Sequence, residues 1–209
     1  MDSQFFFTSQ VNEANVIYTI NAIKDSYYNG ATKLNLYISS PGGDIVSGFR
    51  LFDFLKSIPM EVNTIGFGLV ASSAVTIFLA GVKRKCTRSS TFFLHEGNYT
   101  NSFQQTHHKI LSEIAKIAKH DLDKTIDIIT SVTGKQKNKI VKYLEESSIL
   151  NATQAKSLNI VHDIITELPL LRNNQVPSPQ TPPPASQTQV PPTIPNPPNQ
   201  PGVPGGLYQ

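Results

Sequence analysis

Short apolar runs alternate along this chain with longer segments in which apolar residues recur every three or four positions. The first pattern is typical of buried strands and the second of amphipathic helices. Strands that alternate with helices predict an α/β domain with a largely parallel sheet. The strand-like runs are Phe5–Thr8, Leu34–Ile38, Val62–Phe67, Thr91–Leu94 and Ile160–Ile165. The helix-like segments are 12–29, 45–58, 72–80, 103–131, 137–146 and 152–158.

The chain divides into two regions of different composition. Of its 15 prolines, 12 follow Asn173, and no charged residue lies between Asn173 and Gln209. A segment rich in Pro, Gln, Asn, Thr and Ser buries too little apolar surface to offset the loss of chain entropy on folding. We therefore expect one folded domain over residues 1–172 and a disordered, partly polyproline II tail over 173–209.

Charge and cysteine content exclude several classes of protein. The 18 basic and 15 acidic residues leave a formal net charge of +3, too small to indicate nucleic-acid binding. The densest basic run, Lys83–Lys85 with Arg88, has no interleaved aromatic residues, and we interpret it as a solvated turn. The single cysteine, Cys86, excludes disulfide frameworks and metal–thiolate clusters, and we expect an inert buried thiol. The N-terminus has no signal peptide, so these features favour the cytoplasm.

The uncharged stretch Val62–Val82 raises a competing interpretation, a membrane span. It is just long enough to cross a bilayer, and the basic run follows it as a stop-transfer flank would. Polar residues interrupt it, however, among them Asn63, Ser72 and Ser73. A strand and a buried helix joined at Gly66–Gly68 account for both the apolar character and the interruptions, so we predict no membrane span.

Residues that could take part in catalysis follow three of the predicted strands. Ser40–Gly43 (Ser-Pro-Gly-Gly) follows one strand, and paired glycines let backbone amides approach a ligand. Ser72 follows the next strand at the start of a helix, where free amides and the helix dipole favour an oxyanion. His95 ends a third strand and is the residue type that a serine nucleophile needs as general base. Taken singly, the glycines could form a plain turn and Ser72 a helix cap, but together they favour nucleophilic serine chemistry.

These segments resemble the Clp protease proteolytic subunit, a self-compartmentalised serine peptidase. The similarity rests on Ile38–Asp44 (Ile-Ser-Ser-Pro-Gly-Gly-Asp), Gly68–Ala74 (Gly-Leu-Val-Ala-Ser-Ser-Ala) and Leu94-His95, and continues through Thr133-Gly134. It covers nearly all of residues 5–165. The resemblance implies a crotonase-like α/β fold of repeated β-β-α units with a mainly parallel sheet. It also implies a chain that requires no metal or other cofactor.

The resemblance assigns a role to each site position. Ser72 would be the nucleophile that attacks an unfolded polypeptide, and His95 would be its general base. The backbone amides of Gly43 and Ser73 would form the oxyanion hole, and Gly42 would border the substrate strand. Because Ser72 and Ser73 are adjacent, the nucleophile could instead be Ser73, although the spacing favours Ser72.

The third member of the catalytic triad is where the chain departs from the family. Counted from Thr133-Gly134, the position of the family's aspartate falls on Tyr143, which cannot supply an anion to stabilise an imidazolium. Glu146, one helical turn further on, is the alternative acid. The sequence therefore predicts a serine endopeptidase with an atypical third member. The alternative is a catalytically silent subunit or scaffold that assembles with an active paralogue.

Assembly and partners follow from the same resemblance. The apolar stripe Ile110–Leu122 is longer than a small sheet covers, and the corresponding helix in this family joins two stacked heptameric rings. We therefore expect a homo-oligomeric ring. The chain begins almost at its first strand, without the segment that contacts an ATPase ring in this family, which makes an ATPase unfoldase partner doubtful. The tail contains Pro192-x-x-Pro195, so a module that recruits proline-binding partners is a third interpretation.

Overall fold

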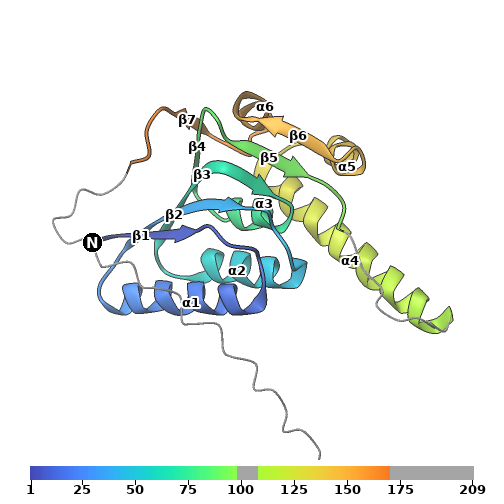
Figure 1. Ribbon diagram of the computed structural model, residues 1–209, viewed down its shortest axis with the longest axis horizontal. Coiled ribbons are helices and arrows are strands. Elements are labelled where there is room, and N and C mark those ends of the chain that lie inside the picture. Colours follow the sequence, from blue (N-terminus) through green and yellow to red (C-terminus); the bar gives the residue numbers. More distant parts are fainter. Residues whose placement is uncertain (98–107, 170–209) are drawn as a thin grey trace, which may run out of the picture. The chain divides into compact units, whose positions relative to one another are not determined.

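The computed structural model describes residues 1–97 and 108–169 of the chain. Within these ranges, strands and helices alternate along the chain as the sequence predicts (Figure 1). The expected disordered tail, 173–209, lies outside the described residues, so the domain boundary at Arg172 stays a prediction.

A seven-stranded, mainly parallel sheet forms the centre of the described region (Figure 1). Five strands follow the order β1-β2-β3-β4-β7, and every neighbouring pair in this row is parallel. Strand β3 pairs with β4 near its start and with β5 near its end, and β5 pairs antiparallel with β6. The strands are β1 (Asp2–Phe7), β2 (Lys33–Ser40), β3 (Glu61–Ala71), β4 (Lys83–Thr87), β5 (Thr91–Leu94), β6 (Ser148–Asn151) and β7 (Asp163–Ile165).

The hydrophobic core forms where helices pack against one face of this sheet. Leu34, Leu36 and Ile38 of β2 are fully buried there, because alternate residues of a strand point to the same side. Asn12 and Asn151 cap helices as expected, each accepting a hydrogen bond from a backbone amide of the first turn. The helices are α1 (Glu13–Tyr28), α2 (Ile45–Ser57), α3 (Ser73–Phe78), α4 (His108–Thr133), α5 (Lys137–Glu145) and α6 (Ala152–Ser157).

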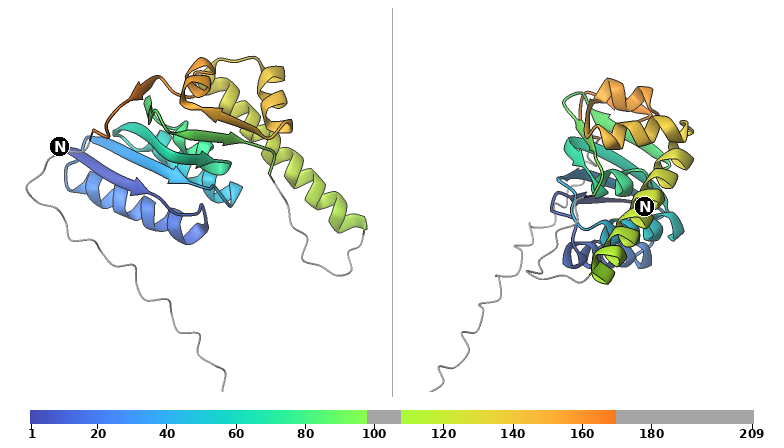
Figure 2. Two further views of the ribbon diagram at one scale, coloured as in Figure 1. Left: turned by 45° about the horizontal axis from the view of Figure 1, so that its top comes forward. Right: turned by 90° about the vertical axis from the view of Figure 1, so that its right-hand side faces the viewer.

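The long helix α4 is buried only in its second half. Ile126 and Ile129 belong to the core, whereas Ile110, Leu111 and Ile117 are 37%, 47% and 56% exposed. Figure 2 shows the first half of α4 extending beyond the edge of the sheet. The apolar stripe that the sequence predicts is therefore present, and most of its first half has no partner among the described residues.

The basic run predicted as a solvated turn is instead strand β4, paired on both sides. Strand alternation turns Arg84 and Cys86 inward, so the arginine is only 5% exposed. Its guanidinium donates to three backbone carbonyls at 2.8–3.0 Å, those of Gly81, Asn159 and Ile160. The turn prediction is wrong because a charged side chain with such partners can be buried, a possibility that charge patterning does not reveal.

The uncharged stretch Val62–Val82 contains most of strand β3 followed by the short helix α3, as predicted. In the part of the chain that the structure describes, no helix is both long and apolar enough to cross a membrane.

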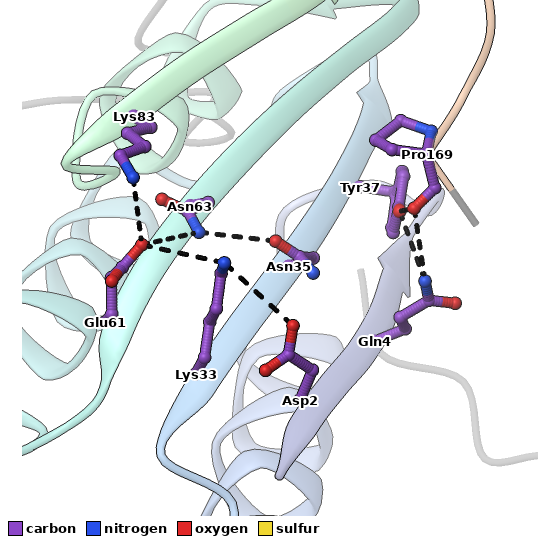
Figure 3. Close-up of polar contacts among 9 residues, drawn as sticks. All are labelled: Asp2, Gln4, Lys33, Asn35, Tyr37, Glu61, Asn63, Lys83 and Pro169. Carbon is purple, nitrogen blue, oxygen red and sulfur yellow. Dashed lines mark hydrogen bonds and ion pairs between the residues drawn. The ribbon is translucent and has the colours of Figure 1, made fainter. Parts of the chain in front are cut away.

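The sheet face that points away from this core carries polar side chains in cross-strand rows (Figure 3). The Asn63 amide donates to Asn35 Oδ1 at 3.3 Å and to Glu61 Oε1 at 3.2 Å. The second bond is the main reason that the pKa of Glu61 is lowered. The Tyr37 hydroxyl donates to the carbonyl of Pro169 at 2.6 Å, which holds the chain beyond β7 near β2 (Figure 3). The Asn63–Asn35 bond joins β3 to β2 and favours their register, because a one-residue slip would move each side chain to the other face.

Candidate active site

A cleft of about 940 Å³ opens where strands β3 and β5 end. Gly43, Ser72, Ser73 and His95 all line it. Ligand sites of parallel sheets commonly lie at the carboxyl ends of strands, because loops from neighbouring strands meet there. The structure therefore brings four of the predicted site residues into one cavity.

Ser72 occupies a sharp turn between strand β3 and helix α3. Its φ of 56° and ψ of −129° lie in a region that residues other than glycine rarely adopt. Its amide donates to the carbonyl of Phe93 at 2.8 Å, which ties the turn to β5. The Ser72 side chain makes no capping hydrogen bond to the helix. The backbone thus places this hydroxyl in the cleft and leaves it available for chemistry.

Gly43 lines the cleft beside Ser72, whereas Gly42 is buried, does not line the cleft and packs against the Ser72 turn. Both have positive φ, 82° and 144° respectively. A Cβ atom on Gly42 would overlap the carbonyl oxygen of Ala71 and lie 2.7 Å from the Cβ of Ser72. The Val11 amide holds the turn from the other side by donating to the Gly42 carbonyl at 2.8 Å. Within the described residues the Gly43 amide donates no hydrogen bond, so it can serve a ligand.

Ser73, the first residue of α3, is 5% exposed. Its hydroxyl donates to the carbonyl of Gly43 at 3.2 Å. An amide in the first turn of a helix has no acceptor within that helix, so the Ser73 amide is also suited to bind an oxyanion.

His95 follows the last residue of β5. Strands β3 and β5 pair in parallel up to Ala71 opposite Phe93, and Ser72 and His95 follow this last pair by one and two residues. The imidazole stacks on the ring of Phe93, with centroids 4.8 Å apart and an interplanar angle of 11°. The candidate base therefore lies on the strand next to the candidate nucleophile.

Tyr143 and Glu146, the two residues predicted at the third triad position, do not line the cleft. Tyr143 is half-buried in α5 and packs against the core. Glu146 follows α5 and pairs with Lys142 at 3.7 Å, with 58% of its side chain exposed. Among the described residues, neither makes a hydrogen bond to His95.

Ser147, which the sequence did not reveal, lies next to the strand that pairs with β5. Strands β5 and β6 pair with Phe93 opposite Ile149 and Leu94 opposite Ser148, and His95 and Ser147 adjoin this last pair in the two chain segments. Ser147 stands in the turn before β6 with a φ of 49° and does not itself line the cleft. The missed signal was strand β6, whose four residues are too few for a clear alternation.

The remaining candidates from the sequence have structural roles. Burial raises the pKa of the Cys86 thiol to about 11, which confirms an inert cysteine. His162 Nδ1 accepts a hydrogen bond from the Arg84 amide at 3.2 Å, and burial together with the Arg84 charge lowers its pKa. His107 lies outside the described residues. Among those that are described, no three His, Cys, Asp or Glu side chains are grouped closely enough to hold a metal ion.

Comparisons with known proteins identify the family and the fold of the chain. The Clp protease family model matches residues 4–168. ATP-dependent Clp protease proteolytic subunit 1 of Bacillus cereus is 33% identical over 132 residues, which are 62% of this chain and 67% of that protein. A ClpP1 mutant from Listeria monocytogenes has a similar fold, with a TM-score of 0.71 and 23% identity over 78% of this chain and 91% of that one. The chain therefore belongs to the Clp protease family, among its proteolytic subunits.

Proposed function

We propose that this chain is a serine-type endopeptidase in which Ser72 is the nucleophile and His95 the general base. The observation that supports this most strongly is the strained strand-to-helix turn at Ser72, in one cleft with His95 and Gly43. Strain retained at a cleft residue indicates a function, because selection for stability alone would remove it. Ser73 suits the nucleophile's role less well, since its hydroxyl is buried and donates to the Gly43 carbonyl.

In the proposed reaction, the Ser72 Oγ attacks the carbonyl carbon of a peptide bond while His95 takes the hydroxyl proton. The carbonyl electron pair moves onto oxygen, and the amides of Gly43 and Ser73 bind this oxyanion. Collapse of the tetrahedral intermediate breaks the C–N bond, and His95 gives its proton to the departing amine. Water, deprotonated by His95, then hydrolyses the acyl-enzyme and restores Ser72.

Unfolded polypeptide is the proposed substrate class. Gly42 and Gly43 present main chain rather than side chains beside Ser72, and main chain recognises an extended peptide whatever its sequence. Helix α4 lines the cleft with Ile114, Ala118 and Leu122, which offer apolar contact to substrate side chains. A folded protein cannot present an extended segment of this kind without local unfolding.

We further propose that Ser147 takes the place of the triad acid. A hydroxyl can accept a hydrogen bond from the imidazole and orient it, but it carries no charge to stabilise an imidazolium. Loss of the acid costs on the order of 10⁴ in turnover in a serine protease, while the oxyanion hole continues to accelerate the reaction. Slow peptide hydrolysis is the expected activity.

The same serine favours the second candidate function, a catalytically silent subunit that assembles with an active paralogue. Labelling of the purified chain with a fluorophosphonate probe separates the two. The endopeptidase predicts that the wild type is labelled and cleaves unfolded casein, and that Ser72→Ala does neither. A wild type that is neither labelled nor able to cleave casein would contradict the endopeptidase and support the silent subunit.

A homo-oligomeric ring is the proposed assembly. Ile110, Leu111 and Ile117 expose apolar surface on the first half of α4, which a second copy of the chain could cover. Light scattering at micromolar concentration is expected to give the mass of a ring. A monomer under these conditions would contradict the proposal for the isolated chain.

A further inference from the structure

We propose that the Ser73 hydroxyl is a positioning group for the oxyanion hole, acting through the carbonyl of Gly43. This inference rests on the proposed peptidase function of the cleft. Ser73 would then contribute to the oxyanion hole in two ways. Its own amide would bind the oxyanion, and its hydroxyl would hold the turn that carries the Gly43 amide.

The Gly43 amide needs such a support because glycine has more conformational freedom than any other residue. Its φ of 144° lies in a region that side-chain-bearing residues rarely adopt, so no substitution with a Cβ could stiffen the position. The Ser73 Oγ holds the Gly43 carbonyl at 3.2 Å. The Val11 amide holds the Gly42 carbonyl at 2.8 Å, and the Asp44 amide, in the same peptide plane as the Gly43 carbonyl, donates to the Val11 carbonyl at 2.8 Å. The Ser73 bond adds a restraint on this second plane from the side of α3 and limits the ψ rotation of Gly43.

The Ser73 side chain is itself held in one position. It is 5% exposed, and a Cβ atom on Gly48 would lie only 3.0 Å from the Cβ of Ser73, so helix α2 passes directly against it. A buried hydroxyl held in this way donates in a fixed direction, as a positioning group must. Helix α2 therefore supports Ser73, and Ser73 supports Gly43.

The test compares two deletions of a buried hydroxyl. Ser73→Ala removes the bond to the Gly43 carbonyl. Ser90→Ala is the matched control, because Ser90 is 2% exposed and donates to the carbonyl of Gly66 at 3.0 Å without lining the cleft. Both variants of the full chain are measured for thermal stability, for kcat and KM on a fluorogenic peptide, and for inhibition by a peptide aldehyde that forms a tetrahedral adduct.

Ser73→Ala is expected to lower kcat about 10- to 100-fold with little change in KM, because a misplaced donor weakens binding of the transition state and not of the substrate. Its affinity for the aldehyde should fall by a similar factor. Ser90→Ala should lose at least as much stability, because Ser90 also bonds the Thr87 hydroxyl at 2.8 Å, and should keep kcat. The inference is overturned if kcat of Ser73→Ala stays within about 2-fold of wild type, if only KM changes, or if Ser90→Ala loses kcat equally. An inactive wild type would contradict the peptidase function itself.

Discussion

The two sides of the cleft are built differently. On the serine side, Ser72, Gly42 and Gly43 are placed by main-chain geometry, with positive φ at all three and backbone hydrogen bonds to β5 and to Val11. On the histidine side, His95 is placed by strand register and by stacking on a neighbouring ring. No hydrogen bond to its imidazole forms within the described residues.

This difference separates the step that depends on the main chain, oxyanion binding, from the step that depends on a side chain, activation of the base. Oxyanion binding depends on amides that every residue carries, so substitutions preserve it unless they move the main chain. Activation of the base depends on a side chain beside His95, and in the proposed function that side chain is Ser147, which carries no charge. We expect a site with an intact oxyanion hole and a weakly activated nucleophile.

The largest effect is expected for Ser72→Ala, which removes the proposed nucleophile. Hydrolysis of unfolded casein and probe labelling are expected to fall by about 10⁴-fold or more, because no other group can form the acyl-enzyme. Ser73→Ala should remain labelled, though more slowly. Labelling of Ser72→Ala together with an inert Ser73→Ala would reverse the assignment of the nucleophile.

Gly42→Ala tests whether main-chain geometry alone controls the serine side. The new Cβ would overlap the Ala71 carbonyl and press on Ser72, so kcat should fall about 100-fold and the free energy of unfolding by about 1–3 kcal/mol. Gly30→Ala is the matched control, because Gly30 has a similar φ of 89° and nothing within 4 Å of the added atom. It should lose about 1 kcal/mol and no activity. Equal kcat losses in both variants would mean that the clash at Ser72 is not the cause.

Ser147→Asp tests the histidine side by adding the missing charge. Peptide hydrolysis is expected to rise about 10-fold or more, part of the 10⁴ that an acid contributes in serine proteases. Tyr143→Asp and Glu146→Gln are controls that should leave the rate unchanged, since Tyr143 packs against the core and Glu146 pairs with Lys142 on the surface. A rise in Tyr143→Asp with none in Ser147→Asp would show that β6 does not set the partner of His95.

The smallest expected effect lies outside the cleft, at His162. Its pKa is lowered from 6.5 by burial, then by the Arg84 charge, with Asp163 acting in the opposite direction. The unfolded chain therefore binds this proton more readily, and the free energy of unfolding should fall as pH drops below about 6.5. Chemical denaturation at pH 7.5 and 5 measures the change. His162→Asn should show a smaller fall, and an equal fall would place the responsible group elsewhere.

Local features of the site could be predicted from the sequence, whereas its cross-strand partner could not. Gly42, Ser72 and His95 each follow an apolar run, so strand ends were visible in the pattern. Ser147 comes next to the His95 segment only through the pairing of β5 with β6, and a strand as short as β6 has no periodic signal. Counting along the chain therefore pointed to Tyr143, since intervals in sequence do not reveal which residues meet across a sheet.

The turn at Ser72 also carries a consequence for the evolution of the chain. Holding a serine at φ 56° and ψ −129° costs about 1–3 kcal/mol of stability, and glycine would release most of it. Substitution of Ser72 by glycine would give a more stable and more abundant protein that lacks the hydroxyl. The proposed peptidase function therefore predicts a serine at this position in spite of the stability that glycine would add.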